Sequence, residues 1–276
     1  MLRALIHADR IRAHRGAALA LGAALLGGCG TLGNGRGWGQ DATIAPGWER
    51  VRAAALKNLE HPMTWGPILG AGVLQLDDFN QRIWEWAKDE QPVFGSTDTA
   101  LEASDEWREI SDDLWIASVL ATKSGDDFGS WTWSKTKGAA VEVVAKGASG
   151  GLTNVFKEIT GRDNPNGDDR IYPSGHATDA WASAALASRN LDATDLPVGL
   201  RLPTRIGLYS VAAVAGWARI ESGDHYPADV LFTTGMTNFV VGFFHDAFLG
   251  LDANPQLSVG LNPDVDAWEV GLAWKF

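Results

Sequence analysis

The chain has 276 residues with a formal net charge of −11 and a sequence pI of about 4.9, and this acidic balance argues against a general nucleic-acid binder. Apolar residues make up 45% of the chain, which is enough for one sizeable core, whereas the mean hydropathy of −0.09 is too low for a protein with many membrane spans.

The first 28 residues have the pattern of a targeting signal, in which four arginines precede a short apolar run from Ala17 to Leu26. That run is too short for a permanent membrane span. The four residues that end at Cys29, Leu-Gly-Gly-Cys, resemble the lipobox of bacterial lipoproteins, in which the cysteine is acylated and becomes the new N-terminus. The resemblance implies a periplasm-facing lipoprotein of the cell envelope, bound to a membrane through Cys29. Gly30 stands where many inner-membrane lipoproteins have aspartate, which favours the outer membrane; an ordinary secretory signal is the alternative.

Residues 29–47 are rich in glycine and are predicted to form a flexible tether. From Trp48 onward the apolar residues recur at helical spacing, and a helical domain is predicted over 48–250. After the helix that begins at Trp48, helices are expected at 63–76, 77–88, 99–123, 137–160, 174–189, 203–221 and 227–249. The last of these is strongly apolar but contains Asn238, His245 and Asp246, so we expect a buried helix there and not a membrane span.

The C-terminal residues 251–276 change to a period of two. Apolar residues occupy every second position in 257–261 and again in 268–276, and the sequence Asn-Pro-Asp at 262–264 is typical of a turn. The predicted fold class is therefore all-α, a helical bundle with a short C-terminal β-hairpin that packs on the helices.

Two short polar clusters contain the histidines that we expect to carry chemistry. In the first, Pro173-Ser174-Gly175-His176, the serine can cap the helix that follows and the glycine lets backbone approach a ligand. A helix N-terminus with free N–H groups and a hydroxyl is a natural site for an oxyanion. His176 then stands in the first turn, where it can donate a proton to a leaving oxygen.

The second cluster spans residues 219–229. His225 and Asp229 are four residues apart, so the carboxylate can contact the ring within one helical turn. That contact fixes the tautomer and leaves the other ring nitrogen free to attack a substrate. Arg219 supplies a planar guanidinium that matches a phosphoryl group.

A third segment, residues 157–165, adds the cations Lys157 and Arg162. Together the three segments resemble the signature of the type 2 phosphatidic acid phosphatase superfamily, which is Lys-x6-Arg-Pro, then Pro-Ser-Gly-His, then Arg-x5-His-x3-Asp. The second and third parts match fully. The first part matches at Lys157 and Pro165 but has Asn164 where the family has arginine. The resemblance covers roughly residues 150–245.

This resemblance implies a helical bundle and a phosphatase mechanism that uses neither a metal nor another cofactor and that vanadate inhibits. By resemblance, His225 attacks phosphorus, Asp229 orients it, and His176 protonates the leaving alkoxide and later activates water. The phosphate oxygens would be held by Lys157, Arg219, Ser174 and the amide of Gly175. Arg162 and Arg170 could each compensate for the missing arginine at Asn164. Of the two we expect Arg162, with a surface ion pair of Arg162 as the alternative.

The sequence thus predicts a phosphatase that hydrolyses phosphate monoesters or diphosphates outside the cytoplasm. Thirteen tryptophans and the expected anchor favour a lipid phosphate, with a soluble-substrate acid phosphatase close behind. A vanadate-dependent haloperoxidase would use the same pocket, and Asn164 keeps open a non-catalytic envelope lipoprotein. The sequence does not specify the substrate, the oligomeric state or the membrane that holds the anchor.

Overall fold

The computed structural model describes residues 29–33, 35–161, 172–250, 256–262 and 267–273, the last two ranges as backbone. Short turns of 3-10 helix lie at η1 (Leu76–Asp78) and η2 (Leu191–Ala193), and a π-helical turn lies at η3 (His245–Leu249). The α-helices are α2 (Trp48–Glu60), α3 (Pro62–Leu74), α4 (Phe79–Glu90), α5 (Thr97–Ala121), α6 (Phe128–Thr160), α7 (Gly175–Asn190), α8 (Val198–Glu221) and α9 (Pro227–Phe244). The helical fold class is confirmed.

Two helices begin earlier than the sequence predicts. Helix α6 starts at Phe128 and not at 137, because the Asp127 carboxylate caps it by accepting hydrogen bonds from the backbone N–H groups of Gly129 and Ser130. Helix α8 starts at Val198 and not at 203. Pro203 suggests a helix start, but it is tolerated inside the helix near its N-terminal end.

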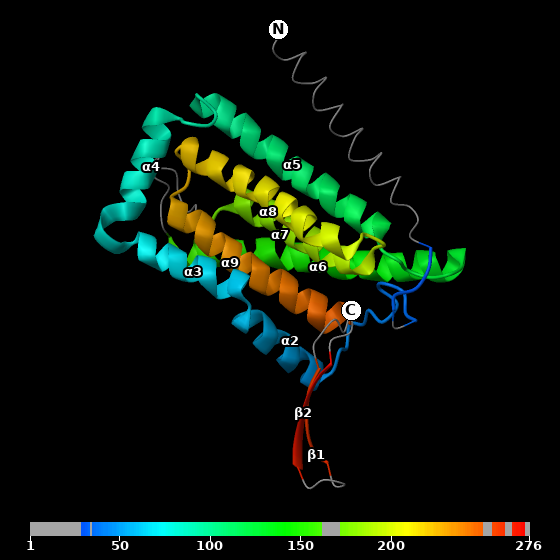
Figure 1. Cartoon of the computed structure of the whole chain (residues 1–276). Helices are drawn as coiled ribbons and strands as arrows, with labels where there is room; N and C mark the ends of the chain where they lie inside the picture. Colours follow the sequence, from blue (N-terminus) through cyan, green and yellow to red (C-terminus); the bar gives the residue numbers. More distant parts are fainter. Residues whose placement is uncertain (1–28, 34, 162–171, 251–255, 263–266, 274–276) are drawn as a thin grey trace.

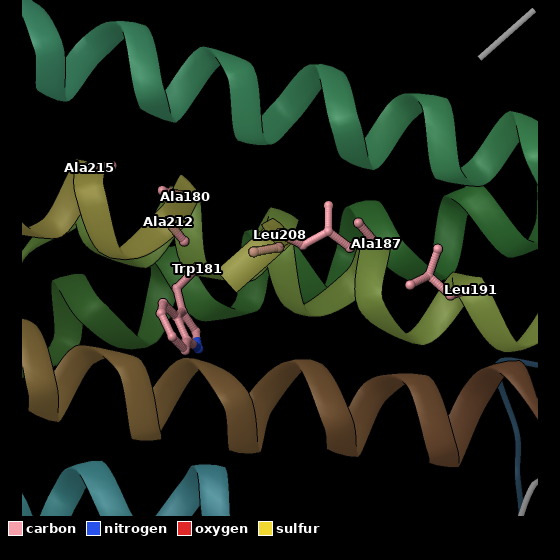
Figure 2. Packing of buried hydrophobic residues seen from close by; sticks show 8 residues of the cluster. Ala180, Trp181, Ala187, Leu191, Leu208, Ala212 and Ala215 are labelled. Carbon is pink, nitrogen blue, oxygen red and sulfur yellow. The ribbon is translucent and has the colours of Figure 1, made fainter. Parts of the chain in front are cut away.

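The centre of the bundle is α7, which packs against α5, α6, α8 and α9, while α2 and α3 cover α9 (Figure 1). Nearly every residue of α7 from Ala177 onward is buried. Alanines predominate in this core, and Trp181 is a large side chain placed among them (Figure 2). Small side chains let helices approach closely, so the polar residues at the ends of α7 are held by rigid neighbours.

Residues 29–47 correct the prediction of a flexible tether. Residues 30–33 and 35–45, which we call the N-terminal strap, lie against the bundle: Gly30 and Gly125 exchange two backbone hydrogen bonds, and Thr43 N–H donates to the carbonyl of Phe248. Trp38 is fully buried, and its ring lies where a side chain at Gly138 would stand. The glycines of the strap allow its backbone to lie close to the bundle and do not make it flexible. A Cβ at Gly37 or Gly39 would overlap with backbone of the bundle.

The C-terminal strands β1 (Gln256–Asn262) and β2 (Ala267–Ala273) pair in antiparallel fashion, with Asn262 opposite Ala267. The expected leader, residues 1–28, lies outside the described residues. Among the helices that the structure does describe, none combines the length and the apolar run that a membrane crossing requires.

Candidate active site

The described parts of the three predicted segments come together at one end of the bundle, which we call the site end. There α7 and α9 begin, while α6 and α8 end with Lys157 and Arg219 in their last turns. Ser174 is buried and caps α7, since its Oγ accepts a hydrogen bond of 3.3 Å from Ala177 N–H. Its own N–H donates to Thr233 Oγ1 of α9 at 3.1 Å. The two helix N-termini are thereby joined around the serine.

His225 and Asp229 form the predicted pair at the start of α9. Both are buried, with 2% and 3% of their surface exposed, and Nδ1 of the ring lies 3.8 Å from the Asp229 carboxylate. That carboxylate also accepts a hydrogen bond from Tyr226 N–H, which fixes its position. Burial lowers the pKa of His225, while Asp229 opposes this shift. A neutral ring with one nitrogen directed at a carboxylate is the state that a nucleophilic histidine requires.

His176 lies in the first turn of α7, with 39% of its side chain exposed. Its Nε2 is 3.1 Å from Oδ1 of Asp105 on α5. Burial and the charge of Arg219 lower the pKa of His176, and Asp105 acts in the opposite direction. Asp105 is not among the residues that the sequence motifs predict, because it lies outside all three motifs. Nothing in the sequence pattern of α5 distinguishes it from the other acidic residues of that helix.

Arg219 is the electrostatic centre of the site end. Its charge helps to lower the pKa of Lys157 as well as those of the two histidines, so all four groups lie near one another. The guanidinium pairs with Asp224 at 2.6 Å, and its Nε is buried without a hydrogen-bond partner. Burial is the larger cause of the lowered pKa of Lys157.

Lys157 and Gly175 are neighbours across the gap between α6 and α7. A Cβ placed on Gly175 would lie 3.6 Å from Nζ of Lys157, so the ammonium stands beside the first turn of α7. The first N–H groups of a helix carry partial positive charge. Two cations and a helix N-terminus therefore converge on one place that suits an anion.

Two predicted features lie outside the described residues. Arg162 and Asn164 belong to the segment 162–171, so the expectation that Arg162 replaces the missing arginine stays a prediction. Within the described ranges, no three His, Cys, Asp or Glu side chains gather as a metal-ligand set. What the site end offers is cations, helix N-termini and two histidines, each beside a carboxylate.

Comparisons with known proteins found one solved structure and one family model. The crystal structure titled "the first transmembrane PAP2 type phosphatidylglycerolphosphate phosphatase from Bacillus subtilis" is similar at 16% identity, with a TM-score of 0.47, over 72% of this chain and 94% of that one. No curated protein matches the chain. The family model described as PAP2 superfamily matches residues 138–249, a range that contains Lys157, His176 and His225. The part of the chain that this model matches is therefore the part that carries the predicted motifs.

Proposed function

We propose that the chain is a phosphatase that hydrolyses phosphate monoesters or diphosphates outside the cytoplasm through a phosphohistidine on His225. The observation that carries the proposal is the convergence of Arg219 with Lys157, His176 and His225 at the N-termini of α7 and α9. The match of residues 138–249 to the PAP2 superfamily model supports a phosphatase of this kind.

In the first step, the substrate phosphate binds between the cations and the start of α7, and the free ring nitrogen of His225 attacks phosphorus. The nitrogen–phosphorus bond forms as the phosphorus–oxygen bond to the leaving group breaks, and His176 gives its proton to the leaving oxygen. Asp229 stabilises the positive charge that the attacking ring acquires. The phosphate oxygens are held by Lys157, Arg219, Ser174 and the Gly175 amide.

In the second step, water attacks the phosphohistidine. His176, now neutral, removes a proton from the water as the new phosphorus–oxygen bond forms. The nitrogen–phosphorus bond breaks, inorganic phosphate leaves, and His225 returns to its neutral state. Burial favours that neutral state, because it lowers the pKa of His225.

An amphiphilic phosphate fits the surroundings of the site end. Aromatic rings stand next to the capped start of α7, where Phe232 contacts both Phe156 and Tyr172 with ring centroids 5.3 Å apart. Val155 and Ile159 on the last turns of α6 are exposed. An acyl or prenyl chain would find apolar contacts there, so we propose a lipid phosphate as the first substrate class.

A soluble phosphate ester is the second candidate, and the N-terminal strap favours it. The strap attaches the residue after Cys29 to Gly125, just before α6 begins, whereas Lys157 lies in the last turn of α6. Helix α6 thus separates a lipid anchor at Cys29 from the site by about 45 Å, at 1.5 Å per residue. The strap therefore does not itself bring the site to the anchoring membrane.

The test is a panel assay on the purified protein with p-nitrophenyl phosphate, a short-chain lipid phosphate and glycerol phosphate, each with and without vanadate. Hydrolysis that vanadate blocks supports the phosphatase, and the preferred ester identifies the substrate class. Bromide oxidation on adding vanadate would indicate a haloperoxidase instead. Inertness in both assays would contradict the proposal and indicate a non-catalytic lipoprotein.

Arg162 is proposed as the compensating cation for Asn164. In that case Arg162→Ala lowers kcat/KM about as much as Arg219→Ala, while Asn164→Arg is neutral or mildly activating. If Arg162→Ala is silent and Asn164→Arg raises activity about a hundredfold, roughly 3 kcal/mol, the site is weakened and not compensated.

A further inference from the structure

Helices α5 and α7 run parallel, and three of the polar contacts between them have the same sequence separation; a further contact, from Asn190 Nδ2 to Ser118 Oγ, lies at the other end of α7. Asp105 contacts His176 at 3.1 Å, Arg108 donates to Asp179 at 3.1 Å, and Ser183 Oγ donates to Asp112 at 2.6 Å. In each pair the two residues are 71 positions apart in the chain. We call these contacts the α5–α7 ladder.

The ladder makes the Asp105–His176 contact a consequence of helix packing. Lys146 of α6 pairs with both Asp179 and Asp112. The Arg108–Asp179 and Asp112–Ser183 contacts are thereby connected to a third helix. Because a helix is rigid over one turn, fixing Arg108 against Asp179 also fixes the residues one turn earlier on both helices. Those residues are Asp105 and His176, at the site end.

The charges that face His176 come from several helices, and most are positive. Arg219 of α8 and Arg108 of α5 both act to lower its pKa, and Lys157 of α6 stands beside the neighbouring Gly175. Asp105 is the carboxylate that opposes them. It lies before residue 138, outside the range that the PAP2 superfamily model matches, on helix α5.

We propose that Asp105 is a positioning residue for His176: it accepts a hydrogen bond from Nε2, holds the ring at the mouth of the site and keeps it protonated for the first step. Nδ1 is then the nitrogen that gives its proton to the leaving oxygen, and the ring that remains keeps its Nε2–H on Asp105. The inference rests on the proposed phosphatase mechanism. It mirrors the second histidine, where Nδ1 of His225 faces a carboxylate and the opposite nitrogen is free to react.

The kinetic test compares Asp105→Asn with the matched control Asp113→Asn, a substitution of the same kind two turns further along α5. Alkyl phosphates need a proton on the leaving oxygen, whereas p-nitrophenolate leaves without one. Asp105→Asn should therefore lower kcat/KM about 10–100-fold for an alkyl phosphate and less than about threefold for p-nitrophenyl phosphate. A merely structural role would lower both by the same factor, and that result would overturn the proposal.

The second test does not depend on activity. Histidine ring signals of the full-length protein are titrated by NMR, with His176→Ala identifying the resonance. The pKa of His176 should be about one unit lower in Asp105→Asn than in the wild type or Asp113→Asn, because the opposing carboxylate is gone. The high-pH limb of kcat/KM should move down by the same amount. An unchanged pKa overturns the role of Asp105, whereas a shifted pKa in an enzyme that hydrolyses no phosphate keeps the pair and overturns the proposed function.

Discussion

At the site end, α7 and α9 present their N-termini, with Lys157 and Arg219 beside them; at the opposite or distal end, α7 presents its C-terminus, with Arg189 in its last turn. A helix N-terminus carries partial positive charge and a C-terminus partial negative charge. A cation at the distal end therefore compensates the partial negative charge at the C-terminus of α7. Lys157 and Arg219 also lie in the last turns of their own helices, but they stand beside the first turns of α7 and α9 and so add to the positive charge of two helix N-termini.

The distal end supplies its own counter-charges. Arg189 donates to Asp246 at 3.1 Å and to Asn58 at 2.8 Å, and Lys57 pairs with the same aspartate at 3.0 Å. Lys135 donates to backbone carbonyls at the end of α5, including that of Thr122 at 2.6 Å. Each of these three cations therefore has a partner within the bundle.

The site end keeps part of its positive charge unmatched. Arg219 has Asp224 as a partner, but its Nε is buried without a hydrogen-bond partner. Buried donors that lack partners cost stability. An anionic substrate would contact this end and not the other, which explains how two ends rich in polar residues differ in function.

The largest expected effect on activity comes from substituting the arginine at the site end, with the arginine at the distal end as the comparison. Arg219→Gln should lower kcat/KM by about 10²–10³-fold, because a charged donor to the phosphoryl oxygens is lost. Arg189→Gln should leave kcat/KM within about threefold and lower the free energy of unfolding by about 3 kcal/mol, since Asp246 loses a buried partner. Equal losses of activity in the two variants would contradict the assignment of substrate binding to the site end alone.

The N-terminal strap belongs to the distal end, so it should affect stability and not catalysis. Trp38→Ala should lower the free energy of unfolding by about 3–5 kcal/mol, as for other buried aromatic residues, with unchanged kcat/KM. Urea unfolding measures this effect, and Trp133→Ala on the exposed surface of α6 is the control. If Trp38→Ala is as mild as its control, the strap does not pack as the structure shows.

The stability contributed by Glu142 should depend on pH. Burial raises the pKa of Glu142 to about 8, while Trp115 and Asn190 donate hydrogen bonds to its carboxylate. The folded state then holds a proton that the unfolded chain releases near its ordinary pKa of 4.5, so stability from this group falls as the pH rises from about 4.5 to 8. Relative to the wild type, Glu142→Gln should gain roughly 2–4 kcal/mol between pH 5 and pH 8. A constant difference between the two proteins across that range would contradict the raised pKa.

The smallest catalytic effect is expected at the anchor. Cys29→Ser should release the protein from the membrane into the periplasmic fraction with normal specific activity, because the anchor and the site lie at opposite ends of α6. Fractionation after a carbonate wash measures the release. A variant that stays with the membrane would show that the attachment lies elsewhere.

The sequence predicts what depends on short-range spacing. The spacing of four residues predicts the proximity of His225 and Asp229, although His225 precedes α9 and is not in a helical turn with Asp229. The cap at Ser174 follows from its place before an alanine-rich run. Asp105 could not be found in this way, since its contact depends on how α5 and α7 pack 71 residues apart. The sequence predicts a flexible tether where the structure has the packed strap, because a glycine-rich run is typical of both a flexible linker and a close backbone contact. The burial of Trp38 distinguishes the two.

The covalent intermediate on His225 is the central claim, and a rapid-quench experiment tests it most directly. Wild-type protein is mixed with a phosphate ester labelled in the phosphoryl group, denatured within milliseconds, and then exposed to acid or to alkali. A phosphohistidine on His225 predicts label that is lost in acid and kept in alkali, with less turnover in Asp229→Asn and neither label nor turnover in His225→Ala. Full activity in His225→Ala, or label that remains on that variant, would contradict it.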